Sequence, residues 1–439
     1  MQAVDTLLYP RWIVPIEPYE SVLEDHAIAI HEGRIIALLP AKQAKITYLA
    51  KNTLYLADHV VMPGLVNSHA HSAMTLFRGM ADDLALMDWL ENHIWLAEKQ
   101  WMNDTFVYDG TQLAILEMLR SGTTCFNDHY FFPNGVARAA VDLGMRAVVG
   151  SLIISFGSCY ALTAEDYIAK AMETYWRWKD NSLISTTIAP HAPYTVDDQS
   201  FIKIKELMDE HLLRAHIHLH ETKGEVEQSL KDYGKRPLKR IADFGLMSER
   251  LICVHMTQIN KEDLAVLQAS GAHVVHCPES NLKLASGLCP TMQLFQANIN
   301  VALGTDGAAS NNDLDMFAEM RMAALLAKAE ANEPTALKAA TALQMATLNG
   351  ARALGLEKEI GSIVVGKWAD LIAVNLADIN TQPVYHPSSH LVYALNSRQV
   401  SDVWIAGKQL LKEGQFVDLD VKGIIAKANE WARKFKRSQ

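Results

Sequence analysis

Short β-branched apolar runs alternate with longer helical stretches through the middle of this chain. Eight such runs lie between residues 60 and 306: Val60–His71, Gly122–Tyr130, Met145–Phe156, Leu183–Pro193, Arg214–Glu221, Leu251–Met256, Ala272–Pro278 and Asn300–Asp306. Strands that alternate with helices are typical of repeated βα units and a parallel sheet, and eight units close a (β/α)8 TIM barrel. A doubly wound open sheet is the competing fold, but its glycine-rich phosphate turn is missing from this sequence. The pattern therefore favours the barrel.

The two ends of the chain show a different pattern, one of short strands and turns. Residues 25–40 form two β runs around a turn at Glu32-Gly33, and a similar texture returns at residues 361–375 and 403–411. We therefore expect an α/β protein in which both ends build one small β-sandwich domain. Residues 1–63 would form its first part, 64–356 the barrel, and 357–439 its second part plus a terminal helix.

Polar residues stand where the barrel strands would end. They are His69 and His71 in the first run, His191 in the fourth, His218 and Glu221 in the fifth, His255 in the sixth and Asp306 in the eighth. The active groups of barrel enzymes lie at the carboxyl ends of the strands. Imidazole is the commonest protein ligand for divalent transition metals, and residues two apart in a strand point to the same side. The pattern predicts a metal site, although alternation alone does not choose among His216, His218 and His220.

Composition narrows the range of partners. The 439 residues are 49% hydrophobic and 21% charged, which suits a large globular core, and the formal net charge of −10 disfavours nucleic acid. The basic cluster at residues 433–437 is expected to be a solvated helix end. We find neither a secretory leader pattern nor an apolar run long enough for a bilayer, so we expect a cytoplasmic protein with no membrane partner. Five scattered cysteines indicate neither disulfides nor a thiolate zinc site.

Several stretches resemble the amidohydrolase superfamily. Residues 63–71 (PGLVNSHAH), 218–221 (HLHE) and 303–307 (LGTDG) are similar to its strand 1, strand 5 and strand 8 signatures. Within the superfamily, residues 276–287 (HCPESNLKLASG) and 304–312 (GTDGAASNN) resemble the 5-methylthioadenosine/S-adenosylhomocysteine deaminases. The similarity covers almost the whole chain, including the split β domain.

The resemblance implies one divalent metal ion, with zinc as the first choice, held by His69, His71, His218 and Asp306. The His-x-x-Glu spacing of the family selects His218 among the three histidines of its strand. Binuclear relatives carry a carboxylated lysine at the end of strand 4, where this chain has His191, and this difference favours a single metal. An open position on zinc lowers the pKa of a bound water to about 7.

The implied activity is hydrolytic deamination of the adenine ring of 5′-methylthioadenosine, S-adenosylhomocysteine or adenosine to hypoxanthine, with release of ammonia. Glu221 would protonate the ring nitrogen, while Asp306 would take the proton of the attacking water and help pass it to the amine. His255 would orient that water. The resemblance also matches Glu98 to the acceptor of the ribose hydroxyls and His191 to a purine contact, so the partner is a small nucleoside.

Three alternatives stay open at this point. The basic partners of a homocysteine carboxylate are not placed, because the loops after strands 2 and 3 match poorly and Arg78 is only a candidate; this leaves methylthioadenosine and adenosine as preferences. A guanine or cytosine deaminase or a triazine hydrolase would share the metal set and differ in pocket contacts. A non-catalytic barrel scaffold is the remote alternative, since Glu221 and His255 are both retained. A homo-oligomer is open as well.

Overall fold

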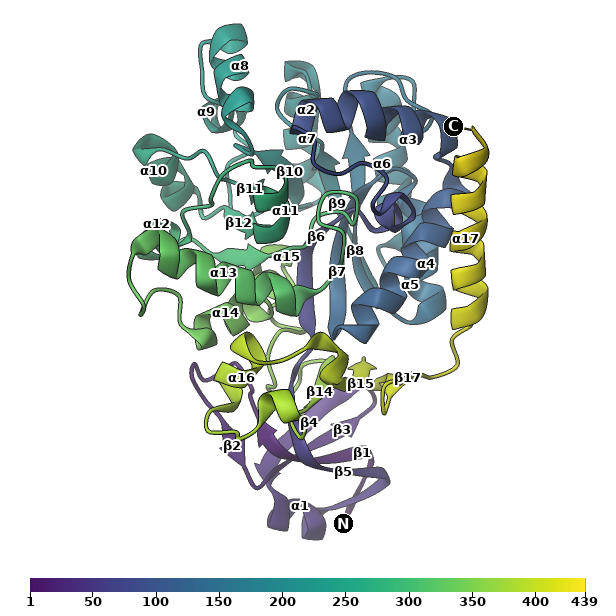
Figure 1. The fold of residues 1–439 in the computed structure, drawn as a ribbon, viewed down its shortest axis with the longest axis vertical. Helices are drawn as coiled ribbons and strands as arrows, with labels where there is room; N and C mark the ends of the chain where they lie inside the picture. The colour runs from purple at the N-terminus through teal and green to yellow at the C-terminus, as the bar shows by residue number, and fades with distance from the viewer. Residues whose placement is uncertain (439) are drawn as a thin grey trace. The chain divides into compact units, whose positions relative to one another are not determined.

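The computed structural model describes residues 1–438 and contains an eight-stranded sheet. Its strands are β6 (Leu65–Ala70), β7 (Thr123–Tyr130), β8 (Arg146–Ile153), β9 (Ile184–Pro190), β10 (Ala215–Leu219), β11 (Leu251–His255), β12 (His273–His276) and β13 (Val301–Leu303). Each lies within one of the eight predicted runs. The strands neighbour one another in sequence order, and a parallel bridge between Ala70 and Asp306 joins the first strand to the segment after the last. The predicted (β/α)8 barrel is confirmed (Figure 1).

Helices follow the barrel strands in turn (Figure 1). They are α4 (Asp104–Arg120), α5 (Pro133–Leu143), α6 (Ala164–Trp178), α7 (Asp198–Glu210), α8 (Lys223–Tyr233), α9 (Pro237–Asp243), α10 (Lys261–Ser270), α11 (Pro278–Lys283), α12 (Thr291–Gln296), α13 (Met316–Ala331), α14 (Ala339–Met345) and α15 (Leu348–Leu354). Local sequence sets several of their starts. Thr163 caps α6 by accepting the Asp166 N–H, and Asn260 forms a reciprocal capping box with Asp263 at α10.

The barrel strands are buried on both faces, which is why most of them appear in the sequence as apolar runs, whereas β7 also buries Asn127, Asp128 and His129. Gly304 permits the last strand to approach the first. A Cβ atom at this position would lie 2.7 Å from the backbone nitrogen of His69, which is closer than a real Cβ atom could come. The Asp306 N–H then donates to the His69 carbonyl over 3.0 Å. The close approach brings Asp306 beside the end of β6.

A helical segment follows the first barrel strand, after a short 3-10 turn, η1 (Ser72–Phe77). It consists of α2 (Leu86–Trp89), a π-helical turn η2 (Leu90–Ile94) and α3 (Trp95–Trp101). We call residues 86–101 the lid segment. π-Helical turns are rare and are frequently found at functional sites.

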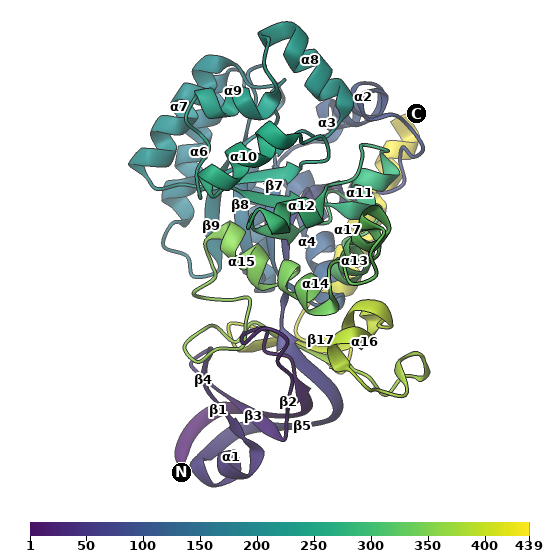
Figure 2. The ribbon, with the colours of Figure 1, turned by 90° about the vertical axis from the view of Figure 1, so that its left-hand side faces the viewer.

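Both ends of the chain contribute to a second, mixed sheet, in the order β17-β16-β15-β14-β5-β1-β3-β4 with β2 paired to β1. Its strands are β1 (Gln2–Ile13), β2 (Leu23–Glu24), β3 (His26–His31), β4 (Arg34–Pro40), β5 (Tyr48–Pro63), β14 (Leu371–Asn375), β15 (Val400–Ile405), β16 (Lys408–Lys412) and β17 (Gln415–Phe416), with the short helices α1 (Ala41–Thr47), η3 (Ile379–Thr381), α16 (Pro387–Tyr393) and η4 (Ser397–Gln399). β14 pairs antiparallel with β5, which joins the two ends as predicted. The strands curve together around an apolar core that includes Leu8, Ile28 and Trp404 (Figure 2).

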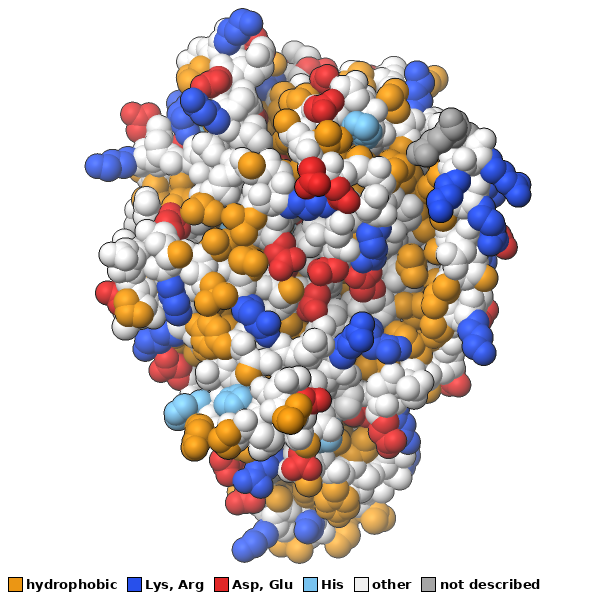
Figure 3. Space-filling view, in the orientation of Figure 1, with side chains coloured by type: hydrophobic (Ala, Val, Ile, Leu, Met, Phe, Trp, Pro, Cys, Tyr) orange, Lys and Arg blue, Asp and Glu red, His pale blue; other side chains and the backbone are white. Residues whose placement is uncertain are grey.

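Contact density divides the chain into two compact units. One contains residues 1–66, 117–125 and 315–419; the other contains 67–116, 126–314 and the chain from Asp420 onward. The predicted boundaries at residues 63 and 356 stay a prediction. The second unit includes α17 (Val421–Ser438), whose basic side chains are exposed (Figure 3). Among residues 1–438, no helix combines the length and the apolar character needed to cross a bilayer.

Candidate active site

Four side chains converge at the carboxyl ends of three barrel strands. His69 lies in β6 and His71 directly follows it, His218 lies in β10, and Asp306 follows β13. Their ligating atoms all lie within 4.8 Å of one another. Asp306 Oδ1 is 3.2 Å from His69 Nε2 and 3.1 Å from His71 Nε2. The structure thus brings together the four residues that the sequence analysis proposed as metal ligands.

Hydrogen bonds on the outer side of two rings determine which nitrogens face the centre. His71 Nδ1 donates to the carbonyl of His129 over 2.5 Å, and His218 Nδ1 donates to the carbonyl of His191 over 2.7 Å. A carbonyl only accepts, so each Nδ1 carries the proton and each neutral ring keeps a lone pair on Nε2. These two Nε2 atoms are 3.3 Å apart, and a cation between them relieves the repulsion of their lone pairs. Three imidazoles and a carboxylate therefore fit a divalent ion such as zinc.

Asp306 is fixed at both carboxylate oxygens. Oδ1 faces His69 and His71, while Oδ2 accepts hydrogen bonds from the hydroxyls of Ser280 at 2.6 Å and Ser310 at 2.8 Å. Burial by itself would raise the pKa of Asp306, but the interactions of Oδ1 with His69 and His71 outweigh it and hold that pKa well below its usual value. The Asp306 backbone is left-handed, with a φ of 63°, a conformation that clusters at functional sites. Asp306 therefore supplies a fixed negative charge.

Glu221 and His255, which the sequence analysis proposed as catalytic groups, lie close to each other beside this cluster. His255 Nε2 is 3.9 Å from Glu221 Oε2. The Asn281 side-chain oxygen lies 2.8 Å from His255 Nδ1, so His255 Nδ1 donates to it and Nε2 is left to face Glu221. The Ser286 hydroxyl lies 3.5 Å from Glu221 Oε1. Burial raises the pKa of Glu221, which favours its protonated form.

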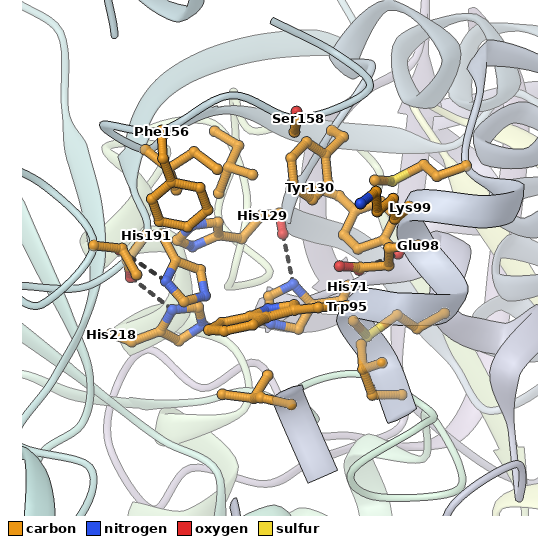
Figure 4. A pocket seen from close by; sticks show the side chains of 18 of the residues that line it. His71, Trp95, Glu98, Lys99, His129, Tyr130, Phe156, Ser158, His191 and His218 are labelled. Carbon is orange, nitrogen blue, oxygen red and sulfur yellow. Dashed lines mark hydrogen bonds between the residues drawn. The ribbon is translucent and has the colours of Figure 1, made fainter. Parts of the chain in front are cut away.

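A cavity of about 630 Å³ opens beside these groups. The lid segment, the end of β8 and the chain after it supply much of the apolar lining, including Leu86, Trp89, Leu90, Trp95, Leu152, Ile154 and Phe156. In Figure 4, Glu98, Lys99 and Tyr130 lie to one side of the cavity, and His191, His218 and Phe156 lie to the other. Among the described residues that line this cavity, Lys99 is the only lysine or arginine. The cavity is therefore mainly apolar away from the histidines.

Two residues predicted to contact substrate, Glu98 and His191, both line the cavity. Glu98 comes from α3 and is only 6% exposed, and the Tyr130 hydroxyl donates to its Oε1 over 2.6 Å. Burial raises the pKa of Glu98 to about 7, although the Tyr130 hydrogen bond opposes the rise. Burial lowers the pKa of His191 to about 3, so its ring is neutral, and its Nδ1 lies 3.0 Å from Thr195 Oγ1.

Sequence reasoning missed two residues that shape the site, His129 and Tyr130, and it set His216 aside in favour of His218. The first two end β7, the second predicted run, to which no site residue was assigned. The polar residues that end this run could have indicated them, because the other site residues were selected by the same feature. Arg78, the candidate partner of a homocysteine carboxylate, does not line the cavity, and its guanidinium donates to the Asn312 carbonyl over 2.7 Å.

Fold and site together define a class of protein: a (β/α)8-barrel enzyme with a cluster of histidines and carboxylates, able to hold a metal ion, at the carboxyl ends of the strands. A model of the amidohydrolase family matches residues 60–410. The chain belongs to the amidohydrolase family and is a hydrolase.

Similar proteins support this assignment over the full length of the chain. A Teredinibacter turnerae protein named 5-methylthioadenosine/S-adenosylhomocysteine deaminase is 48% identical over 98% of this chain and 98% of its own. A Saccharophagus degradans protein of the same name is 46% identical over 98% of this chain and 97% of its own. The crystal structure of an adenosine deaminase from Xanthomonas campestris, with bound zinc, is 50% identical, covers 99% of both chains and has a TM-score of 0.98.

Proposed function

We propose that this chain is a metal-dependent deaminase that converts the adenine ring of 5′-methylthioadenosine, adenosine or S-adenosylhomocysteine to hypoxanthine and releases ammonia. One observation carries the proposal: a protonatable Glu221, a buried Glu98 and three members of the four-residue cluster, His71, His218 and Asp306, line one cavity. The relatives named as deaminases of such nucleosides support it.

The cation would be held by His69, His71, His218 and Asp306. We propose a single ion, with zinc as the first choice. When bound, a divalent cation of this kind supplies Lewis acidity and makes a water molecule a nucleophile near neutral pH. The chain itself supplies the proton transfers that the exchange of an amine for oxygen requires.

Glu221 and Asp306 divide these proton transfers between them. Glu221, whose pKa burial raises, gives its proton to the ring nitrogen next to the attacked carbon. Asp306 takes one proton from the attacking water and delivers it to the amino group, so that the carbon–nitrogen bond breaks and ammonia leaves. The remaining hydroxyl proton returns to Glu221 as the carbonyl forms, which restores the starting state. His255, held at Nδ1 by Asn281, keeps the attacking water in line with the ring.

Glu98 and the apolar wall would select the rest of the substrate. An ionised carboxylate is a good acceptor for two neighbouring hydroxyls, so Glu98 would bind the ribose 2′- and 3′-hydroxyls. His191, neutral and fixed by Thr195, would contact the purine. The apolar lining suits a methylthio group better than a zwitterionic homocysteine, for which Lys99 is the only lysine or arginine among the described lining residues. We therefore rank methylthioadenosine and adenosine above S-adenosylhomocysteine.

Ammonia release from a panel of substrates tests the proposal. The purified, metal-loaded protein is assayed with 5′-methylthioadenosine, adenosine, S-adenosylhomocysteine, guanine, cytosine and a chlorinated or aminated triazine. We expect turnover of the adenine nucleosides, with the highest kcat/KM for methylthioadenosine or adenosine. Turnover of guanine, cytosine or the triazine without turnover of any adenosine derivative would overturn the proposal.

A further inference from the structure

Strand β10 carries His216 and His218, His220 directly follows it, and the structure gives each of the three a different environment. His218 belongs to the metal cluster. His220 has a left-handed backbone, with a φ of 53°, and its ring instead accepts the Leu238 N–H at Nε2 over 2.9 Å and bonds the Gln258 carbonyl at Nδ1. His216 is fully buried inside the barrel. Neither His216 nor His220 belongs to the four-residue cluster of the proposed site.

The ring of His216 is held at both nitrogens. Its Nε2 lies 2.9 Å from Nδ1 of His69, and the two rings are nearly perpendicular, at 85°. Its Nδ1 lies 3.1 Å from the side-chain amide of Asn127, and that amide also donates to the Ser68 carbonyl over 3.0 Å. His69 thus has one ring nitrogen at the metal cluster and the other on His216.

We propose that His216 is a positioning residue for the metal ligand His69. This inference rests on the proposed metal site. Histidine ligands usually hydrogen-bond through their second nitrogen, because that bond fixes the orientation and the tautomer of the ring. For His71 and His218 the acceptors are backbone carbonyls; for His69 the acceptor is a side chain, so this one ligand can be changed by mutation.

The positions of the ring protons decide which group donates and which accepts in the hydrogen bonds from His69 to His216 and from His216 to Asn127. His69 binds a cation through Nε2 only with its own proton on Nδ1, which it donates to His216 Nε2. His216 then carries its proton on Nδ1 and needs an acceptor from Asn127. The Asn127 side-chain oxygen is buried and has no hydrogen-bond partner within residues 1–438. A half-turn of the amide would present this oxygen to His216, at the expense of the bond to Ser68.

A second cation beside His216 is the competing explanation. His129 is buried, neither of its ring nitrogens has a hydrogen-bond partner in the described part of the chain, and its ligating atom lies within 4.8 Å of those of His69 and His216. Zinc–nitrogen bonds of about 2.0–2.1 Å separate two tetrahedral ligands by roughly 3.3 Å. The separation of 2.9 Å between the His69 and His216 nitrogens is instead that of a hydrogen bond.

Metal affinity of two variants tests the positioning role. A glutamine can present an amide oxygen where His216 Nε2 lies, whereas a methionine of similar size presents no comparable acceptor. We expect His216→Met to weaken zinc binding about 10- to 100-fold in competition with a chelator, and His216→Gln to restore most of the loss. Zinc binding of His216→Met at the strength of the unaltered protein would overturn the proposal.

His220→Met is the matched control, because it removes a buried histidine that directly follows the same strand and lies outside the cluster. We expect it to lower thermal stability and leave zinc affinity unchanged; an equal loss of affinity in both methionine variants would show that His216 acts only through the fold. Metal analysis of the unaltered protein separates the remaining outcomes. One equivalent of zinc is expected, two equivalents would favour the second cation, and none would refute the proposed metal site itself.

A measurement on the unaltered protein covers the case in which His216→Met does not fold. In zinc-loaded chain labelled with ¹⁵N-histidine, the hydrogen bond between His69 Nδ1 and His216 Nε2 should give a nitrogen–nitrogen coupling across the shared proton. A ring proton of His69 without this coupling would contradict the assigned order.

Discussion

The two ends of the active-site cavity are built differently. At the proposed metal end, each of the four candidate ligands has a second contact that fixes it: His71 and His218 bond backbone carbonyls, His69 bonds His216, and Asp306 accepts from two serines. At the other end, Glu98 lies in the lid segment, and among residues 1–438 its carboxylate has one hydrogen-bond partner, Tyr130. Side chains that several contacts fix on or beside rigid strands keep their geometry, whereas the position of a side chain with a single hydrogen-bond partner changes more easily. The metal end should therefore determine whether the reaction occurs, and the lid end which substrate undergoes it.

A change of Glu221, which lies beside the metal end, should have the largest effect on turnover and tests whether this end determines the reaction. We expect Glu221→Gln to lower kcat by at least about 10³-fold, because the amide cannot give up a proton to the ring nitrogen. Zinc content should stay at the level of the unaltered protein, since Glu221 lies outside the four-residue cluster. Turnover and metal content are measured on the same preparation, and near-normal turnover would remove Glu221 from its role.

At the lid end, Glu98 should make the free energy of unfolding depend on pH. Burial raises the pKa of Glu98 from 4.5 to about 7, so folding favours its protonated form. The stabilisation is complete below pH 4.5 and is lost as the pH rises through about 7, a change of about 3 kcal/mol. Glu98→Gln cannot titrate. We expect the variant to gain stability relative to the unaltered protein over this interval.

Denaturant unfolding of both metal-free chains between pH 4.5 and 8 checks this expectation. His71 and Tyr130, the groups that act on the Glu98 pKa, are present in both chains, so their direct contributions largely cancel. A difference in unfolding free energy that stays constant with pH would show that Glu98 is not protonated on folding.

The sequence predicted the two ends of the cavity to different extents, because one is built on buried strands and the other on a helix. Barrel strands are buried on both faces, so most of the eight stood out as apolar runs, and the polar residues that end them marked the metal end. Glu98 could be selected only through the resemblance, since a helix rich in tryptophan is usually core. Backbone conformation was the main limit: the left-handed turn at His220, which separates it from His218, has no signal in an alternating pattern.

A substrate without the ribose hydroxyls sharpens the assignment of the lid end. Hydrogen bonds to a charged group contribute about 1.5–3 kcal/mol, so Glu98→Gln should lower kcat/KM for adenosine by roughly 10- to 100-fold. For 2′,3′-dideoxyadenosine, which offers no diol, the same variant should have little effect. Steady-state kinetics with both nucleosides measure the ratio. An equal loss for both would place Glu98 elsewhere than at the ribose.

The smallest expected effect concerns Tyr130, whose hydroxyl donates a hydrogen bond to the buried carboxylate of Glu98. Tyr130→Phe removes the hydrogen bond that opposes the raised pKa of Glu98, so a larger fraction of this carboxyl is protonated at neutral pH. We expect kcat/KM for adenosine to fall a few-fold, and at most about tenfold, with the dideoxy analogue unaffected.

Combining Tyr130→Phe with Glu98→Gln separates an effect through Glu98 from a general effect on the fold. If the hydroxyl acts through the carboxylate, the double variant should be no slower than Glu98→Gln alone, because the interaction it would remove is already absent. Additive losses, or an equal loss with the dideoxy analogue, would mean that Tyr130 supports the cavity wall instead. Since the metal end does not change in any of these variants, zinc affinity should be the same in all of them.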